Sequence, residues 1–289
     1  MLARCVHWSS CMRPFTLAAI GLLALSSSAC VKKESEEPLS QSEALDAVDE
    51  TSLSSQASSL TSASIDISTN FTIGGAVEQA ASELRTFVTT QLPCADTSLT
   101  GSTLSVTYGV KPGNCLYHGH TFSGQTQVKV THNSQDAWGD TVVDHTWTDF
   151  SDGKVKVNGT AHVTWSLSNP SRRIIHSLVW TRLSDGRTGT GSGDRTQTSL
   201  DGDITRGLVE NGSYAWEGQR GRWDLSIQGV EMRWADPVPQ AGTLVLDTPK
   251  DQSISMSFSR RDADSIEVTV TSDGRSFPFV VNGTGIQNR

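Results

Sequence analysis

Short stretches of alternating apolar and polar residues follow one another from about residue 99 to the C-terminus. The alternation has a period of two, and the stretches are rich in Val, Ile, Thr and aromatic residues, as half-buried strands are. Examples are TLSVTYGV, KVKVNGTAHVTW and SIEVTVTS. The pattern predicts a mainly β domain over residues 99–289, built as a large antiparallel meander of roughly 10–13 strands.

Three turns of one sequence form separate these strands: SDGK at 151–154, SDGR at 184–187 and SDGR at 272–275. Asp-Gly pairs favour the positive φ angles that tight primed hairpin turns require. VNGT also occurs twice, at 157–160 and 281–284. The irregular spacing of these motifs argues against a solenoid or a propeller. We therefore expect a curved sheet or a barrel-like fold of successive hairpins.

A helical pattern precedes the strands. In residues 74–92, apolar side chains recur at helical spacing, and Pro93 ends the pattern. An apolar stripe of this kind most often packs on a sheet. We expect residues 71–98 to form one N-terminal α-helix, with its exit, packed on the β domain.

The segment before this helix is acidic and rich in Ser and Thr. Residues 31–70 contain few side chains that could build a core, a composition typical of disorder or of a loose helix. We expect residues 30–70 to be a tether. The whole chain has a net charge of −8 and no dominant basic patch, so no nucleic-acid partner is expected.

The sequence MRPFTLAAIGLLALSSSAC, residues 12–30, has the form of a secretory signal peptide. Arg13 supplies a positive charge, a short apolar run follows, and small residues lead to Cys30. The run is shorter than the about 20 apolar residues of a membrane-spanning helix. We expect residues 1–29 to be the signal peptide, with Met12 as the true start.

Ser28 and Ala29, directly before Cys30, resemble the lipobox of bacterial lipoproteins, although Ser27 stands where that family usually has Leu. The resemblance implies that Cys30 is lipidated and becomes the first mature residue. Inner-membrane lipoproteins usually carry Asp after this cysteine, and this chain has Val31. The resemblance thus implies attachment to the outer membrane through the lipid, facing the periplasm or the outside.

Only two cysteines remain after the leader and Cys30 are set aside, Cys94 and Cys115. An even pair in an exported chain is most simply a disulfide. It would join the helix exit to the start of the sheet.

The stretch CLYHGHTF holds two histidines two residues apart. As a strand it would place Leu116, His118, His120 and Phe122 on one face. Two histidines on one face can bind a metal, with His132 of the next strand as a third ligand. Hydrogen-bonded histidines of an ordinary sheet are the favoured alternative, because no third ligand is fixed by spacing. No cofactor is expected.

Two further motifs point to no specific site. GTGSGD, residues 189–194, lacks the Gly-Lys-Ser/Thr ending of a phosphate loop, so a flexible hairpin or edge is expected. Asp194, Asp201 and Asp203 offer oxygens for calcium but no full ligand set.

The sequence contains no nucleophile motif. A glycan hydrolase would need paired carboxylates in an aromatic cleft. The candidates are Asp144, Asp149 and Glu217, which lie near Trp147 and Trp216 in the sequence.

A longer resemblance starts at LPCADTSL. The pair Tyr108-Gly109, the turn at 113–115, and Gly119 and Gly124 are similar to a pattern in uncharacterised bacterial envelope lipoproteins, where it opens a β meander. The resemblance implies a kind of protein but no activity. We expect a binding or structural module whose partner is an envelope protein or a glycan. The alternatives are a carrier of an apolar or lipid-like ligand, a metal-binding protein and a glycan hydrolase.

Overall fold

The computed structural model describes residues 39–70, 76–132, 141–166 and 171–287. All of them belong to one unit, Glu37–Arg289. The predicted signal peptide and Cys30 lie outside the described residues.

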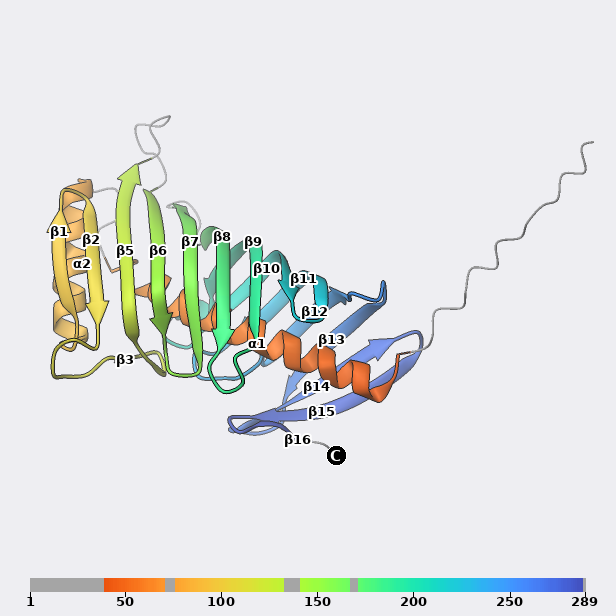
Figure 1. Ribbon diagram of the computed structural model, residues 1–289. Coiled ribbons are helices and arrows are strands. Elements are labelled where there is room, and N and C mark those ends of the chain that lie inside the picture. Colours follow the sequence, from red (N-terminus) through yellow and green to blue (C-terminus); the bar gives the residue numbers. More distant parts are fainter. Residues whose placement is uncertain (1–38, 71–75, 133–140, 167–170, 288–289) are drawn as a thin grey trace, which may run out of the picture. The chain divides into compact units, whose positions relative to one another are not determined.

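Fourteen strands form one antiparallel sheet in which each strand pairs with its neighbours in the chain (Figure 1). A two-stranded hairpin, β3–β4, is inserted between β2 and β5. The strands are β1 (Asp96–Thr100), β2 (Thr103–Tyr108), β3 (Leu116–Tyr117), β4 (His120–Thr121), β5 (Ser123–His132), β6 (Thr141–Ser151), β7 (Val155–Ser166), β8 (Ser171–Arg182), β9 (Thr188–Ser199), β10 (Leu208–Gly218), β11 (Gly221–Met232), β12 (Ala241–Asp247), β13 (Ser253–Arg260), β14 (Ser265–Ser272), β15 (Arg275–Asn282) and β16 (Gly285–Gln287).

The predicted antiparallel meander is confirmed, in its curved-sheet form. Among the described strands, β1 and β16 are the two edges and do not pair with each other, so the sheet is open. The sheet curls around a helix, so that both β7 and the distant strand β14 contact that helix (Figure 1).

The helix inside the curl is α1 (Gln41–Ile67), and it corrects the prediction of a tether over residues 30–70. Ser40 caps its N-terminus in a capping box with Glu43. Most of its residues are buried, although its apolar residues form no stripe. The composition offered few core residues, but over Gln41–Ile67 polar side chains of the sheet hold the helix in place of an apolar stripe.

The predicted helix over residues 74–92 is confirmed as α2 (Val77–Gln91). Ala80, Ala81, Leu84 and Val88 are its buried residues. The helix packs on β1, β2 and β5 and also contacts α1, so both helices cover the same face of the sheet (Figure 1).

The glycine-rich stretch lies in β9, a strand in the middle of the sheet, and not at a flexible hairpin or edge. A Cβ atom on Gly189 would come within 2.6 Å of the Trp180 ring, and one on Gly193 within 2.7 Å of His176. The glycines therefore leave room for large side chains of the neighbouring strands, which cover β9 in their place.

The predicted disulfide between Cys94 and Cys115 is confirmed, with a Cα–Cα distance of 5.4 Å. Cys94 follows α2 and Cys115 precedes the β3–β4 hairpin. The bridge therefore joins the helix exit to the start of the sheet, as expected.

We expect the double variant C94A/C115A to unfold with a free energy about 3 kcal/mol lower than that of the wild type. The bridge spans a sequence separation of 21, and closing a loop of that size restricts the unfolded chain by about this amount. Urea unfolding of both proteins measures the difference. Equal midpoints and equal slopes would contradict the expectation.

Candidate functional site

Polar contacts hold α1 against the sheet along its whole length. Asp49 forms ion pairs with Arg182, at 2.7 Å, and with Arg187, which also pairs with the buried Glu50. Burial opposes ionisation of Asp49, but the hydrogen bond and charge of Arg182 keep its pKa below the ordinary value. Other contacts along the helix are Glu43–Lys250 (2.5 Å), Asp46–Arg220 (3.0 Å), Ser58–Arg195, Ser62–Gln197 (3.1 Å), Ser64–Trp147 (3.0 Å) and Ser68–His145 (3.1 Å).

A network of buried charges lies beneath the middle of α1. Glu210 is 3.3 Å from Arg195 and accepts a hydrogen bond of 2.5 Å from Gln197. Gln197 accepts a hydrogen bond of 2.9 Å from Arg172, whose guanidinium is also near the charge of Asp66. Burial is the main cause that lowers the pKa of Arg172, to about 10. The two buried arginines are thus balanced by two carboxylates.

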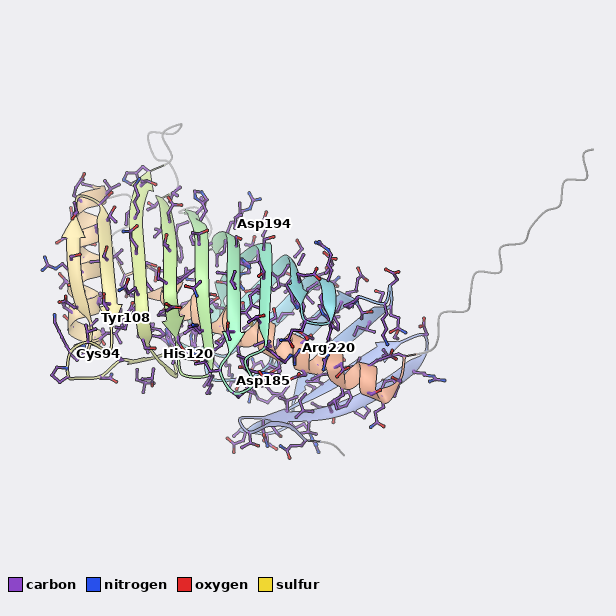
Figure 2. All side chains as sticks on the ribbon, viewed as in Figure 1. Cys94, Tyr108, His120, Asp185, Asp194 and Arg220 are labelled. Carbon is purple, nitrogen blue, oxygen red and sulfur yellow. A yellow bond between two sulfur atoms is a disulfide. The ribbon has the colours of Figure 1, made fainter. Side chains whose placement is uncertain are left out.

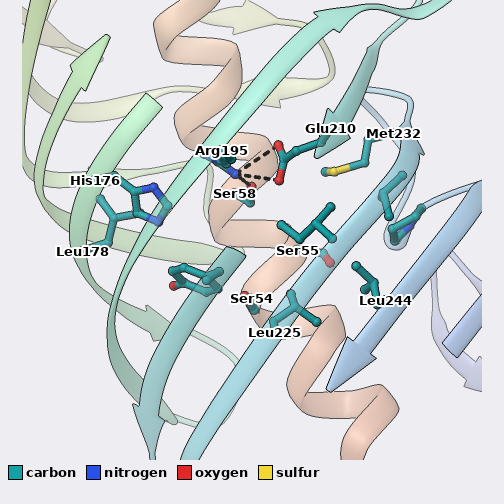
Figure 3. Close-up of a pocket in the computed structure, with 14 residues that line it drawn as sticks. Ser54, Ser55, Ser58, His176, Leu178, Arg195, Glu210, Leu225, Met232 and Leu244 are labelled. Atoms are coloured by element: carbon teal, nitrogen blue, oxygen red, sulfur yellow. Dashed lines mark hydrogen bonds and ion pairs between the residues drawn. The ribbon is translucent and has the colours of Figure 1, made fainter. Parts of the chain in front are cut away.

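A small cavity borders this network, between α1 and strands β8 to β12 (Figure 3). Arg195, Glu210 and His176 line one part of it, and Leu225 and Leu244 line the other. Within the described residues, Arg195 Nε and His176 Nδ1 have no hydrogen-bond partner. The cavity volume of about 30 Å³ suits a single water molecule, which could bond these atoms.

A larger open groove lies beside α1, and we call it the turn groove. Its volume is about 710 Å³, within the range of ligand sites. Its walls are the β6–β7 turn, the β8–β9 turn, the β15–β16 turn and the edge strand β16. The lining residues are Leu45, Asp46, Asp49, Ser52, Gln56, Gly153, Lys154, Arg182, Leu183, Ser184, Pro237, Val281, Asn282, Gly283, Thr284, Gly285 and Ile286.

Two SDG motifs and the second VNGT motif thus meet at this groove, although they are far apart in the sequence. In the SDGR turn at 272–275, both Asp273 and Gly274 have positive φ, as predicted for a primed turn. In the other two SDG motifs only the glycine does. There the aspartate side chain accepts backbone N–H bonds instead, as Asp152 does from Lys154 and Val155. The occurrence of VNGT at 157–160 lies within β7 and forms no turn.

A chain of three polar side chains adjoins the turn groove. Ser59 Oγ lies 3.1 Å from His120 Nε2, and His120 Nδ1 lies 2.8 Å from Asp152 Oδ2. All three side chains are buried. Burial opposes ionisation of Asp152, but hydrogen bonds from His120 and from the backbone outweigh it and hold the pKa of this carboxyl below its ordinary value. His120 and Asp185 of the β8–β9 turn lie toward the same end of the strands (Figure 2).

The structure does not bring the three predicted metal ligands together. The expected strand is a tight hairpin, because His118 and Gly119 both adopt positive φ between β3 and β4. His118 bonds to Asp66 at 2.8 Å and stacks on Trp234. His132 lies at the far end of β5, roughly 30 Å from the start of that strand. No group of three metal-ligating side chains occurs among the described residues.

The three aspartates considered for calcium have separate partners. Asp194 pairs with Arg173, Asp201 pairs with Arg206 at 2.9 Å, and the Asp203 side chain bonds to Thr205. Pairing with arginine explains the first two aspartates, and turn formation explains the third.

The acids considered for glycan hydrolysis face solvent, while the neighbouring tryptophans face α1. The side chain of Asp144 is 48% exposed and that of Asp149 is 65% exposed, whereas Trp147 is buried. Glu217 is exposed next to the buried Trp216. Strand alternation puts Asp144 and Glu217 on the face opposite the rings. A β-bulge between Trp147 and Phe150, with positive φ at Asp149, turns Asp149 outward, so the acids and rings do not form the expected cleft.

The sequence alone does not single out Ser59 or Asp152. Ser59 is one serine of many in a low-complexity segment, and no local pattern distinguishes it. Asp152 stands out in the sequence only as part of an SDG turn. The signal available was that His120, an imidazole next to an apolar face, needs partners when buried.

Comparison with protein-family models, with curated proteins and with solved structures finds no match to the chain. In the described part of the chain, neither helix has the length and apolar character that crossing a membrane requires.

Proposed function

We propose that the protein is a lipid-anchored bacterial envelope lipoprotein that binds an extended peptide segment of a partner in the turn groove. The observation that carries the proposal is the groove itself, open and bordered by the edge strand β16. An edge strand offers unpaired backbone groups to which a peptide can add as a further strand. Leu183 and Ile286 supply apolar contacts, and Lys154 supplies a positive charge, whereas Arg182 is already paired with Asp49.

A peptide fits this groove better than the other partners we expected. The groove has no aromatic residue in its lining, whereas a glycan site would gain most from aromatic rings. A lipid-like ligand would need an apolar cavity under the sheet, and α1 fills that space. The cavity beside α1 has a volume of only about 30 Å³.

The proposal includes a lipid anchor because the residues before Cys30 resemble a lipobox. Leu39 is buried in the folded unit, and eight residues, 31–38, separate it from Cys30. A chain of that length reaches at most about 30 Å. A lipid on Cys30 would therefore keep the groove close to the membrane surface, and we place that surface at the outer membrane because Val31 replaces the retention aspartate.

A peptide array tests the groove. We expect the wild-type domain to bind a subset of twelve-residue peptides, and we expect L183D to lose at least tenfold in affinity for them. Leu183 is 47% exposed and lines the groove, so an aspartate there would remove an apolar contact. Val179 lies four residues earlier, is 43% exposed and is not part of the groove lining, so V179D is the matched control. Equal loss in both variants, or no binding by the wild type, would overturn the proposal.

A further inference from the structure

The chain Ser59–His120–Asp152 has the connectivity of a nucleophile, a general base and an orienting carboxylate. Asp152 Oδ1 accepts backbone N–H bonds from Lys154 and Val155, which fix the carboxylate in its turn. Its Oδ2 then faces His120 Nδ1 at 2.8 Å. Three separate elements, α1, β4 and the β6–β7 turn, contribute the three side chains.

The hydrogen bonds also define the protonation of the imidazole. An ionised carboxylate only accepts hydrogen bonds, so His120 Nδ1 carries the proton toward Asp152. In a neutral imidazole, His120 Nε2 is then an acceptor for the Ser59 hydroxyl, 3.1 Å away. The same hydroxyl oxygen lies 3.2 Å from the carbonyl oxygen of Trp234. The Ser59 hydroxyl therefore has two acceptors within hydrogen-bond distance, His120 Nε2 and this carbonyl oxygen. An imidazole with its proton on Nδ1 and with Nε2 unprotonated is the tautomer that a general base next to a serine requires.

The turn groove reaches residues next to Ser59 and Asp152. Ser52 and Gln56 line it from α1, seven and three residues before Ser59, which puts them on the same side of the helix. Gly153 and Lys154 directly follow Asp152, and Pro237 lies three residues after Trp234.

From this geometry we infer that Ser59 is an acyl-transfer nucleophile, and that the protein hydrolyses an ester or peptide bond of a segment bound in the turn groove. The inference rests on the proposed function, because the groove would hold the substrate. Ser59 Oγ attacks the acyl carbon and its proton passes to His120 Nε2. The bond to the leaving group breaks, and His120 returns that proton to the leaving alcohol or amine. Water then attacks the acyl-serine, gives one proton to His120 and releases the acid, and the proton returns to Ser59.

Labelling with a fluorophosphonate, which reacts with activated serines, tests this inference on the purified lipid-free chain. We expect a single adduct, mapped to Ser59 by peptide mass spectrometry. S59A abolishes it, and H120Q slows labelling by at least a hundredfold because the base is lost. S55A, one turn earlier on α1, labels like the wild type. Far-UV circular dichroism and melting curves establish that each variant is folded.

Labelling of the wild-type chain by itself decides whether the inference holds. If the folded chain gives no Ser59 adduct under conditions that fully label a known serine esterase, the hydroxyl only fastens α1 to the sheet and the inference is wrong. Failure of the groove proposal looks different. In that case the peptide array is blank while Ser59 still labels, because the probe is small. Conversely, S59A retains peptide binding if the groove binds peptides without cleaving them.

Discussion

Replacing Glu210 with leucine is expected to lower the free energy of unfolding by about 3–5 kcal/mol, because it leaves a charge buried without its partner. Arg195 is 3% exposed and pairs with Glu210, so its guanidinium cannot turn to solvent when the carboxylate is lost. Gln197 loses its acceptor at the same time. Urea unfolding followed by tryptophan fluorescence measures the difference.

Two further variants make this prediction specific. The double variant R195M/E210L removes both charges, and we expect it to recover most of the lost stability, as apolar replacements of buried pairs do. Glu217 lies on the same strand but is exposed, so E217L should change the free energy by less than about 1 kcal/mol. If E210L and E217L have equal effects, the network under α1 does not contribute as the structure indicates.

Lowering the pH from 7 to 5 is expected to lower the free energy of unfolding by roughly 4 kcal/mol, through His145 and His176. Burial is the main cause that lowers the pKa of His145 to about 3 and that of His176 to about 2. The charges of Arg172 and Arg195, respectively, lower these pKa values further. Unfolded histidine has a pKa near 6.5. Below that pH the unfolded chain binds protons that the native state excludes, so stability is complete above pH 6.5 and falls as the pH decreases.

Urea titrations at pH 7, 6 and 5 check this dependence. The expected slope is about 1.4 kcal/mol per pH unit for each histidine. H145Q and H176Q should each remove about half of the slope, since glutamine does not titrate. His162 is half-exposed and paired with Asp144, so H162Q should leave most of it in place. A slope that is unchanged in H145Q and H176Q would show that other groups cause the acid sensitivity.

The sheet could be predicted from the sequence because its signal is local. Strands such as β2, β5, β7, β8 and β12 to β15 each show their own alternation, and the SDG turns mark several ends. The glycine-rich β9 does not show it. Helix α2 has an apolar stripe, and Pro93 marks its end. The disulfide followed from counting the cysteines of a chain that its N-terminus predicts to be exported. These features depend only on neighbouring residues or on composition.

The position of α1 could not be predicted in this way. Its partners, such as Arg182, Arg195 and His145, are more than 70 residues away in the sequence and come from different strands. A serine-rich segment with no apolar stripe becomes a buried helix only when such partners surround it. The same is true of the turn groove, where Gly153, Ser184 and Gly283 meet only after the sheet has curled.

The stretch GNCLYHGHTFSG shows which features follow from the sequence alone and which depend on the tertiary structure. By itself the sequence determined that Cys115 pairs with Cys94 and that a mainly β domain follows. Only the tertiary structure decided what the histidines do. Positive φ at His118 and Gly119 turns the segment into a hairpin. The curl of the sheet then brings His120 between Ser59 and Asp152, because hydrogen-bond partners of a buried imidazole are set by packing and not by sequence distance.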